Sequence, residues 1–460
     1  MISRRTFAAS ALASAAFLGL ARRSLGQDGS ASTYRNEIRG YGDLVPDPSG
    51  LLDLPSGFGY RIISSAGERM DDGYFTPSHF DGMGCFAVDR RCVALVRNHE
   101  LSIRVRERGP AGEDPVLAER LLREGVFGTD NEGRPLPGGT TTLIYDLVSG
   151  RLERQHLSLS GTLVNCAGGT TPWGSWLTCE ESSARPDEVA REHGWVFEVP
   201  SAHRGLIAPE PLRAMGRFRH EAAAVDPRTG IVYLTEDRED SLFYRFIPAD
   251  RRHLGQGGRL QALGFAETGI ADTRNWTQTE FAPRSSRTVR WIDLEEVESP
   301  ADDLRQRGRA RGAALFARGE GIHHGNDAVY FTCTSGGRAR LGQIMRYVPG
   351  SNEGKPGETH SPGQLELFIE STDPAVMDYA DNLTVAPNGH LIVCEDRARA
   401  QPCHLKGVTS EGRIYTLARL NVQTELAGAC FSPDGRVLFV NIYHPGKTVA
   451  ITGPWATFNS

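Results

Sequence analysis

Short runs of β-branched and apolar residues, separated by tight turns, recur along most of the chain. Ala222–Asp226 and Ile231–Leu234 flank one such turn, and similar pairs of runs surround the turns Pro387–Gly389 and Pro433–Gly435. Proline, aspartate, asparagine and glycine favour tight turns, whereas β-branched residues favour the strands on either side. The pattern therefore predicts a series of β-hairpins.

Three less regular copies bring the number of expected hairpins to six, and they span Cys85–Val96, Gly168–Thr178 and His324–Thr332. Hairpins that recur at intervals of tens of residues, with insertions between them, are typical of a β-propeller. Leu304–Arg318 has the main helical periodicity, and we expect a short insertion helix there at best. We therefore predict an all-β protein, a six-bladed β-propeller with loop and short-helix insertions. A large β-sandwich is the alternative.

The N-terminal residues differ in character from the rest of the chain. Arg4 and Arg5 precede an alanine-rich apolar run, Ala8–Ala21, and two further arginines follow it. Paired arginines before a short apolar run are typical of a twin-arginine (Tat) export signal, and the run is shorter than the roughly 20 residues that span a bilayer. We predict a Tat signal peptide at 1–27, a lead-in segment at 28–49 and the propeller at 50–460. The mature protein would then be periplasmic or secreted, with the Tat machinery as a partner and no stable membrane span.

Composition adds little to this picture but excludes some alternatives. The 460 residues carry a formal net charge of −6, which disfavours nucleic acid as the main partner. Eight cysteines are too few for a disulfide scaffold, although Cys85 and Cys92 could face each other across their hairpin.

Acidic residues and one cysteine lie at the open ends of several predicted hairpins. They are Cys166, Glu181, Glu221, Glu236, Glu320, Asp381 and Glu395. In a propeller the equivalent ends of all blades meet at one mouth of the central channel, so these side chains are expected to form a ring. Like charges at such short distances need protons or cations. Carboxylates suit Ca²⁺, Mg²⁺ or Fe³⁺, and the thiolate adds a preference for a transition metal, so the sequence predicts a metal site.

Longer motifs surround these residues. They are GGTTTLIYD (Gly138–Asp146), LVNCAGGTTPWGSWLTCEE (Leu163–Glu181), GRFRHEAAAVDP (Gly216–Pro227), ARGEGI (Ala317–Ile322) and DNLTVAPNGHLIVCED (Asp381–Asp396). Together with the Ser432–Gly435 turn, they resemble the PhoX family of alkaline phosphatases. The resemblance extends from about Gly42 to the C-terminus, and the long motif that contains Cys166 is its most specific part.

The resemblance implies a propeller that holds Fe³⁺ and Ca²⁺ ions and hydrolyses small phosphomonoesters. It makes Cys166 the thiolate shared by the irons and Arg318 the catalytic, phosphate-binding arginine, which would stabilise charge developing in the transition state. The metal-ligating carboxylates that it implies are Glu181, Glu221, Glu320 and Asp381. The assignments of Glu236, Asp237 and Glu395 to the site rest mainly on hairpin geometry.

Two other functions fit the same pattern. One is a calcium-dependent propeller hydrolase of the lactonase or phytase type, whose site would need no thiolate, so Cys166 argues against it. The other is a non-enzymatic periplasmic binding propeller, which would hold little metal. We expect a monomer in each case.

Overall fold

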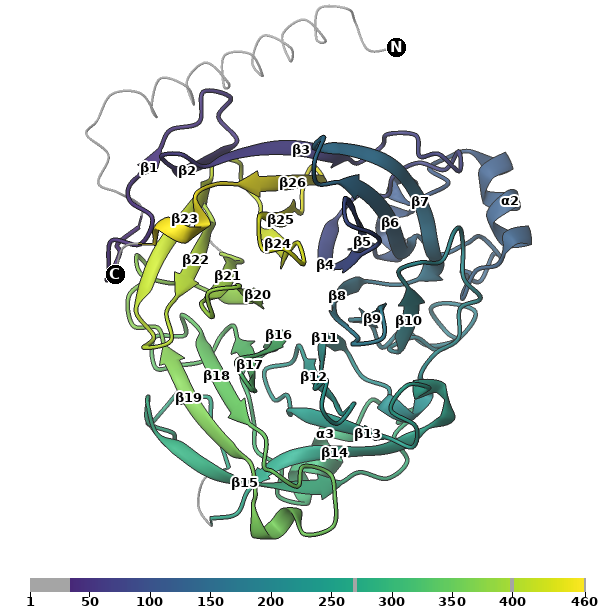
Figure 1. Ribbon diagram of the computed structural model, residues 1–460. Helices are drawn as coiled ribbons and strands as arrows, with labels where there is room; N and C mark the ends of the chain where they lie inside the picture. The colour runs from purple at the N-terminus through teal and green to yellow at the C-terminus, as the bar shows by residue number, and fades with distance from the viewer. Residues whose placement is uncertain (1–33, 268–270, 398–400, 459–460) are drawn as a thin grey trace, which may run out of the picture.

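β-Sheets arranged radially around a central channel make up the protein. The computed structural model describes residues 34–267, 271–397 and 401–458, and the predicted signal peptide at 1–27 lies outside them. Figure 1 looks along the channel. Each predicted hairpin and the strands that follow it form one series of antiparallel strands, which we call a hairpin series, and its first strand lies nearest the axis. These innermost strands are β4 (Phe80–Ala87), β8 (Asn165–Thr170), β11 (His220–Val225), β16 (Gly319–Gly325), β20 (Ala380–Val385) and β24 (Leu426–Phe431). The predicted propeller is confirmed, and each innermost strand begins one of the predicted hairpins.

Two sheets follow the chain in simple order. One consists of β4, β5 (Cys92–His99), β6 (Gly138–Asp146) and β7 (Arg151–Thr162). The other consists of β8, β9 (Ser175–Glu180) and β10 (Val196–Pro200). The register of the first hairpin places Cys85 opposite Leu95. Cys85 and Cys92 therefore do not face each other, and both are free cysteines.

One nine-stranded sheet joins two hairpin series at their outer edges. It contains β11, β12 (Val232–Glu236), β13 (Tyr244–Pro248), β14 (Gly258–Phe265), β15 (Ser286–Asp293), β16, β17 (Ala328–Cys333), β18 (Gln343–Val348) and β19 (Gln364–Glu370). β15 pairs with β14 on one side and with β19 on the other. The described residues consequently form five hydrogen-bonded sheets, whereas the sequence predicted six separate blades.

Strands from the N-terminal region complete the last two sheets. β1 (Leu44–Val45) and β2 (Leu52–Pro55) extend the sheet of β20, β21 (Leu391–Glu395), β22 (His404–Val408) and β23 (Ile414–Leu420). β3 (Gly59–Ser65) adds to β24, β25 (Val437–Ile442) and β26 (Lys447–Thr452), and thereby closes the ring of sheets. The described part of the predicted lead-in, residues 34–49, is therefore packed on the propeller, partly through β1.

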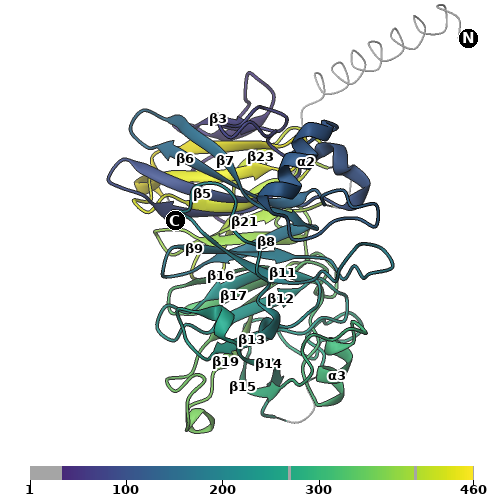
Figure 2. The ribbon, with the colours of Figure 1, turned by 90° about the vertical axis from the view of Figure 1, so that its right-hand side faces the viewer.

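Helices occur only as insertions in the described residues. α3 (Leu304–Ala310) is the short helix expected near Leu304, whereas α2 (Pro115–Glu124) was not predicted. The Asp114 side chain caps α2 by accepting hydrogen bonds from the amides of Val116 and Leu117. The 3₁₀ helices are η1 (Ile103–Arg108), η2 (Arg213–Met215), η3 (Leu254–Gln256), η4 (Glu358–His360) and η5 (Trp455–Thr457). Figure 2 shows α2 and α3 on the same side of the propeller.

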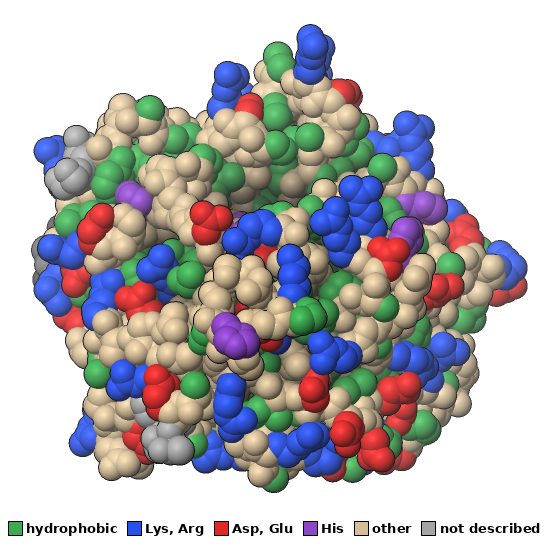
Figure 3. Space-filling model, turned by 60° about the horizontal axis from the view of Figure 1, so that its bottom comes forward, with side chains coloured by type: hydrophobic (Ala, Val, Ile, Leu, Met, Phe, Trp, Pro, Cys, Tyr) green, Lys and Arg blue, Asp and Glu red, His purple; other side chains and the backbone are tan. Residues whose placement is uncertain are grey.

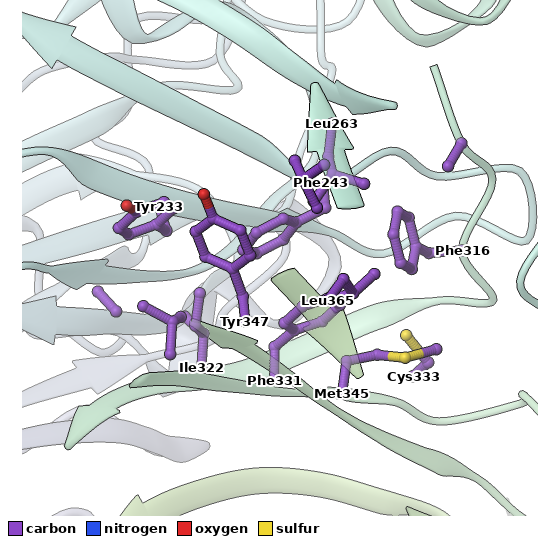
Figure 4. Close-up of a cluster of buried hydrophobic side chains, with 14 of the residues drawn as sticks. Tyr233, Phe243, Leu263, Phe316, Ile322, Phe331, Cys333, Met345, Tyr347 and Leu365 are labelled. Atoms are coloured by element: carbon purple, nitrogen blue, oxygen red, sulfur yellow. The ribbon is translucent and has the colours of Figure 1, made fainter. Parts of the chain in front are cut away.

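Apolar side chains fill the space between neighbouring hairpins of the propeller. Figure 4 shows the cluster between the two halves of the nine-stranded sheet, where the rings of Phe243 and Phe331 stack 4.1 Å apart. Leu263, Met345 and Leu365 in the same cluster are fully buried. Each such side chain contributes about 1.5–3 kcal/mol on transfer from water, so this packing fixes the blades around the channel. On the outer surface, basic and acidic side chains are interspersed over the face drawn in Figure 3.

Candidate metal centre

Each of the six innermost strands has a shift in its pairing register near its beginning. The shift lies between Phe80 and Met83 in β4, for example, and between His220 and Ala223 in β11. The first residues inside the shifts are Asp81, Cys166, Glu221, Glu320, Asp381 and Gly428. A β-bulge turns a side chain away from the regular alternation of a strand. The repeated bulge therefore gives five of the strands an acidic or thiol side chain at an equivalent position.

These side chains form one continuous series around the channel. In each of four groups, all the potential ligand atoms lie within 4.8 Å of one another. The groups are Asp81–Glu100–Cys166, Cys166–Glu181–Glu221, Glu221–Glu320–Asp381 and Asp381–Asp396–Glu425. Successive groups share Cys166, Glu221 and Asp381. We call the members of these groups the ring.

Glu221 shows most directly that the ring fits cations. The residue is 1% exposed, and neither carboxylate oxygen has a hydrogen-bond partner among the described residues. A buried carboxylate without a partner is costly, and a coordinated cation removes that cost. Carboxylates combined with one thiolate form a donor set suited to hard cations and a transition metal. The acidic groups of the ring can therefore hold metal ions.

The electrostatics of the ring support the same conclusion. Burial raises the pKa of Glu181 to about 8 and the pKa of Glu100 to about 7. Burial, together with the charges of Glu181 and Asp381, raises the pKa of Glu221 well above its usual range. The pKa of the Cys166 thiol is likewise raised by burial and by Asp81. Without cations these groups retain protons near neutral pH, so protons and metal ions compete for the ring.

Arg318 lies at the edge of the ring. Its Nε and Nη2 atoms donate to the Asp237 carboxylate at 2.7 and 3.0 Å, and Nη2 also donates to Glu320 Oε1 at 2.7 Å. Although burial acts in the opposite direction, Glu320 and Asp237 raise the pKa of Arg318, so the guanidinium remains charged. Arg318 has a φ of 55°, a left-handed conformation that is unusual for a residue with a side chain. The structure thus holds a permanent cation beside Glu320.

Glu236 and Glu395, two of the predicted ligands, lie outside the ring groups. Tyr244 donates its hydroxyl hydrogen to Glu236 Oε2 at 2.6 Å, and the His404 ring lies 2.8 Å from Glu395 Oε2. Successive residues of a strand point to opposite faces, so the side chain after each glutamate is directed differently. Asp237 contacts Arg318, and Asp396 belongs to the ring. Glu395 therefore lies one residue before a member of the ring, and Glu236 lies one residue before Asp237, which contacts Arg318.

Sequence reasoning also missed several acidic residues around the channel. They are Asp81, Glu100, Asp396 and Glu425. Asp81 precedes the Cys85–Val96 hairpin and Glu100 follows it, which are the positions that Cys166 and Glu181 occupy in the next blade. The positions of Asp81 and Glu100 on either side of this hairpin could therefore have been recognised from the sequence. Glu425 lies one residue before β24, outside the bulge, and has no counterpart in the hairpin pattern.

Glycine or alanine occupies the next position along five of the innermost strands, and asparagine occupies it in β20. These residues are Gly82, Ala167, Ala222, Gly321, Asn382 and Ala429, and they line a cavity of about 260 Å³ along the channel. A Cβ atom on Gly82 would lie 2.5 Å from the Cα of Ala167, so the close approach of β4 and β8 requires glycine there. His323 and His324 line this cavity and are not members of the ring.

Comparisons with known proteins gave one family match and several similar solved structures. A family model described as alkaline phosphatase PhoX matches residues 39–446. The solved structure of Pseudomonas fluorescens PhoX in complex with vanadate, a transition state analogue, shares the fold with a TM-score of 0.67 at 18% identity, covering 91% of this chain and 98% of that one. A gluconolactonase from Xanthomonas campestris has a TM-score of 0.42 at 13% identity, covering 90% and 98% of the two chains. No match was found among curated proteins.

A β-propeller whose mouth is surrounded by buried and half-buried carboxylates and a thiol belongs to a class of proteins that can bind metal ions. The family match covers most of the chain, so the protein belongs to the alkaline phosphatase PhoX family. It is therefore a phosphatase, a hydrolase of phosphomonoesters.

Proposed function

We propose that the protein hydrolyses small phosphomonoesters at the mouth of the propeller, with metal ions held by the ring and Arg318 beside them. The observation that carries the proposal is the continuous series of buried and half-buried potential ligands in a member of this family. Glu221, whose buried oxygens have no partner among the described residues, is its strongest single element.

The donor types favour two kinds of ion. The groups that contain Cys166 combine a thiolate with carboxylates, which suits Fe³⁺, whereas the groups made only of carboxylates suit Ca²⁺. When bound, such ions supply Lewis acidity towards the phosphoryl oxygens and lower the pKa of water. Predicted ligands that belong to the ring are Cys166, Glu181, Glu221, Glu320 and Asp381, and we add Asp81, Glu100, Asp396 and Glu425.

Arg318 would bind and orient the phosphoryl group. Arginine has five N–H donors, and the bonds to Asp237 and Glu320 leave further donors for a phosphate. Asp237 holds the guanidinium at the edge of the ring by two hydrogen bonds, so little reorganisation is needed when charge develops on the phosphoryl oxygens. No nucleophilic side chain is required by this arrangement.

Elemental analysis of the natively purified protein, with phosphomonoesterase activity measured on the same sample, tests the proposal. Iron and calcium together with turnover are the expected result. Calcium without iron, in a protein that does not turn over a phosphomonoester, would favour the lactonase-type alternative. A correctly folded protein that holds neither metal would contradict the proposal and favour a binding propeller.

Export by the Tat machinery and a monomeric state belong to the same proposal. The support for export is Arg4-Arg5 and the apolar run that follows. Among the described helices, none has the length and apolar character needed to cross a bilayer. Replacing both arginines by lysine should retain the protein in the cytoplasm, and light scattering of the mature protein measures its oligomeric state.

A further inference from the structure

In three blades, a fully buried glutamate directly precedes an acidic residue of the channel mouth. Glu180, Glu236 and Glu395 end strands β9, β12 and β21, and each is 0% exposed. Glu181, Asp237 and Asp396 follow them in the sequence. None of the three glutamates belongs to the ring, so the metal-binding proposal gives them no role.

Glu180 is held by four donors. Its Oε1 atom accepts a hydrogen bond from the Leu163 amide at 2.9 Å and lies 2.6 Å from Nδ1 of His193. Its Oε2 atom accepts from the amides of Gly194 and Trp195 at 2.9 and 3.2 Å. These donors come from both sides of β9, so the glutamate fixes the end of that strand.

Glu395 repeats the arrangement in another blade with different neighbours. Its Oε1 atom accepts from the Asp378 amide at 3.0 Å, and its Oε2 atom accepts from the His404 amide at 3.1 Å. The Nδ1 atom of His404 lies 2.8 Å from Oε2, and Arg397 Nε lies 3.1 Å from it. In both blades a buried histidine before or at the start of the next strand therefore faces the glutamate. Glu236 differs, because its main partner is the Tyr244 hydroxyl and its Oε1 atom has no hydrogen-bond partner among the described residues.

The residue after each glutamate is fixed from a second direction. The Glu181 amide donates to the Val164 carbonyl at 2.8 Å, and the Asp396 amide donates to the Tyr379 carbonyl at 3.0 Å. Val164 and Tyr379 have φ values of 51° and 55°, in the left-handed region that bulky residues rarely adopt. Such strain persists only where the surrounding structure enforces it, and it concentrates at functional sites.

The buried glutamate and the strained residue together determine where the side chain of the following acidic residue points. The buried glutamate fixes the last residue of the strand, and the strained carbonyl fixes the amide of the next residue. Because the side chains of successive residues in a strand point to opposite faces, a fixed Glu180 or Glu395 directs Glu181 or Asp396 towards the channel. Partners that orient a metal ligand in this way commonly alter metal affinity when they are removed.

We infer that Glu180 and Glu395 are positioning residues of the metal centre, which direct Glu181 and Asp396 towards the channel and thereby set the affinity of the ring for cations. The inference rests on the proposed metal-binding function. It assigns these two glutamates a task beyond stabilising the fold, and the two roles are separable by experiment.

Glu353 offers a matched control. It is 2% exposed and accepts hydrogen bonds from Arg245, Tyr347 and Tyr233, but it belongs to no ring group. A glutamate-to-glutamine change keeps the side-chain size and turns one acceptor oxygen into a donor, which opposes the N–H groups that face it. Glu353→Gln should therefore reduce stability in the same manner as Glu180→Gln and Glu395→Gln, without acting on the ring.

The experiment titrates Ca²⁺ alone into chelator-treated full-length protein by calorimetry, with thermal unfolding of the same samples. We expect Glu180→Gln and Glu395→Gln to weaken calcium binding by about 10–100-fold. Glu353→Gln should lower the melting temperature and leave calcium affinity as in the wild type. Folded Glu180→Gln and Glu395→Gln proteins with wild-type calcium affinity would overturn the inference.

Histidine variants test the same inference if the glutamine variants do not fold. His193→Asn keeps a donor near the place of Nδ1, whereas His193→Leu removes it and leaves Glu180 unchanged. Calcium affinity should survive in the asparagine variant and fall in the leucine variant, and equal affinities would contradict the inference. A wild-type protein that binds calcium and shows these differences, but does not hydrolyse phosphomonoesters, would contradict only the proposed function. A wild type that binds no calcium would contradict both.

Discussion

Two groups of buried and half-buried carboxylates in this protein are neutralised in different ways. Beside the nine-stranded sheet, Glu353 and Glu358 surround Arg245, which is almost fully buried above the Trp291 ring. Arg245 Nη1 donates to Glu353 at 2.6 Å, and Nη2 donates to Glu358 at 2.8 Å. The chain supplies its own cation at this site, with hydrogen bonds of good geometry.

The ring has many more carboxylates and few protein cations. Among the described residues, Arg318 pairs with Glu320, and Arg219 lies 3.6 Å from Glu181. The contrast appears in the pKa values: although burial acts to raise it, Arg245 lowers the pKa of Glu358, whereas burial and neighbouring carboxylates raise the pKa of Glu221. At the Arg245 site, whose role is stability, the protein itself provides the positive charge. At the ring, where we propose catalysis, most of the positive charge would come from cations bound from solution.

Removing a ligand from the ring, the site without enough protein cations, should have the largest effect, and the effect should be on activity and bound metal. Cys166→Ala is expected to lower kcat/KM for a phosphomonoester by about 1000-fold or more and to reduce bound iron, because the proposed ions supply most of the charge stabilisation. Steady-state kinetics and elemental analysis measure both quantities. Cys333→Ala, which removes a buried cysteine outside the ring, is the control. Full activity and iron content in Cys166→Ala would show that the thiolate has no part in the centre.

Removing the internal cation should have the next largest effect, on stability. Arg245→Leu leaves Glu353 and Glu358 buried without their counter-charge, so the free energy of unfolding should fall by about 3–5 kcal/mol. Urea unfolding followed by circular dichroism measures it. In metal-free protein, Glu221→Gln should instead preserve or raise stability, because the raised pKa of Glu221 makes the fold take up a proton near neutral pH, whereas glutamine is neutral and needs none. If both variants change the free energy of unfolding in the same direction, the proposed difference between the Arg245 site and the ring is contradicted.

The Arg318 guanidinium should matter mainly to turnover. Arg318→Ala is expected to reduce kcat/KM by about 100-fold while iron and calcium contents stay close to those of the wild type, because arginine interacts with the phosphoryl group. Arg318→Lys should recover only part of the loss, since lysine cannot donate two parallel hydrogen bonds. Loss of the metals from Arg318→Ala would instead assign this residue a structural role in the ring.

The smallest predicted effect is a difference in pH dependence. The pKa of Glu181 is about 8 and that of Glu100 about 7 in the metal-free fold, against 4.5 as the ordinary value. The fold therefore binds more protons than the unfolded chain between about pH 4.5 and 8, so stability should fall as pH rises through this window. The pKa of Glu358 is lowered, and its contribution is instead lost in acid.

Thermal unfolding of chelated protein at several pH values measures this effect, and added calcium should remove the decline at higher pH. A chelated protein whose stability rises steadily between about pH 5 and 8 would contradict the expected proton uptake by the folded ring.

The local pattern predicted the hairpins and much of the ring. Turn residues and β-branched runs placed the hairpins, and acidic residues before them led to Glu221, Glu320 and Asp381. The choice between adjacent acidic residues could not be made in the same way. The bulge adds its extra residue to β20, at Asp381–Asn382. The hairpin pattern counted from the turn therefore does not show which residue of β21, Glu395 or the Asp396 that follows it, accompanies Asp381 at the channel.

Long-range pairing was also beyond the local pattern. β15 connects two hairpin series because it pairs with β14 and with β19, which lies far along the chain. A short strand carries no local mark of a distant partner, so the sequence suggested six separate blades. The positioning glutamates were equally hidden, since Glu180 and Glu181 look alike until their hydrogen-bond donors are known.

Strand β3 has a consequence for how the protein is made. It pairs with β26, so an N-terminal strand completes the sheet that carries β24 and the last part of the ring, including the neighbouring Glu425. During synthesis, β3 emerges from the ribosome long before its partner, and a partial chain is an open arc with unpaired strand edges. Such distant pairing slows folding. The metal centre is thus a property of the finished chain, assembled only after the final strands have been translated.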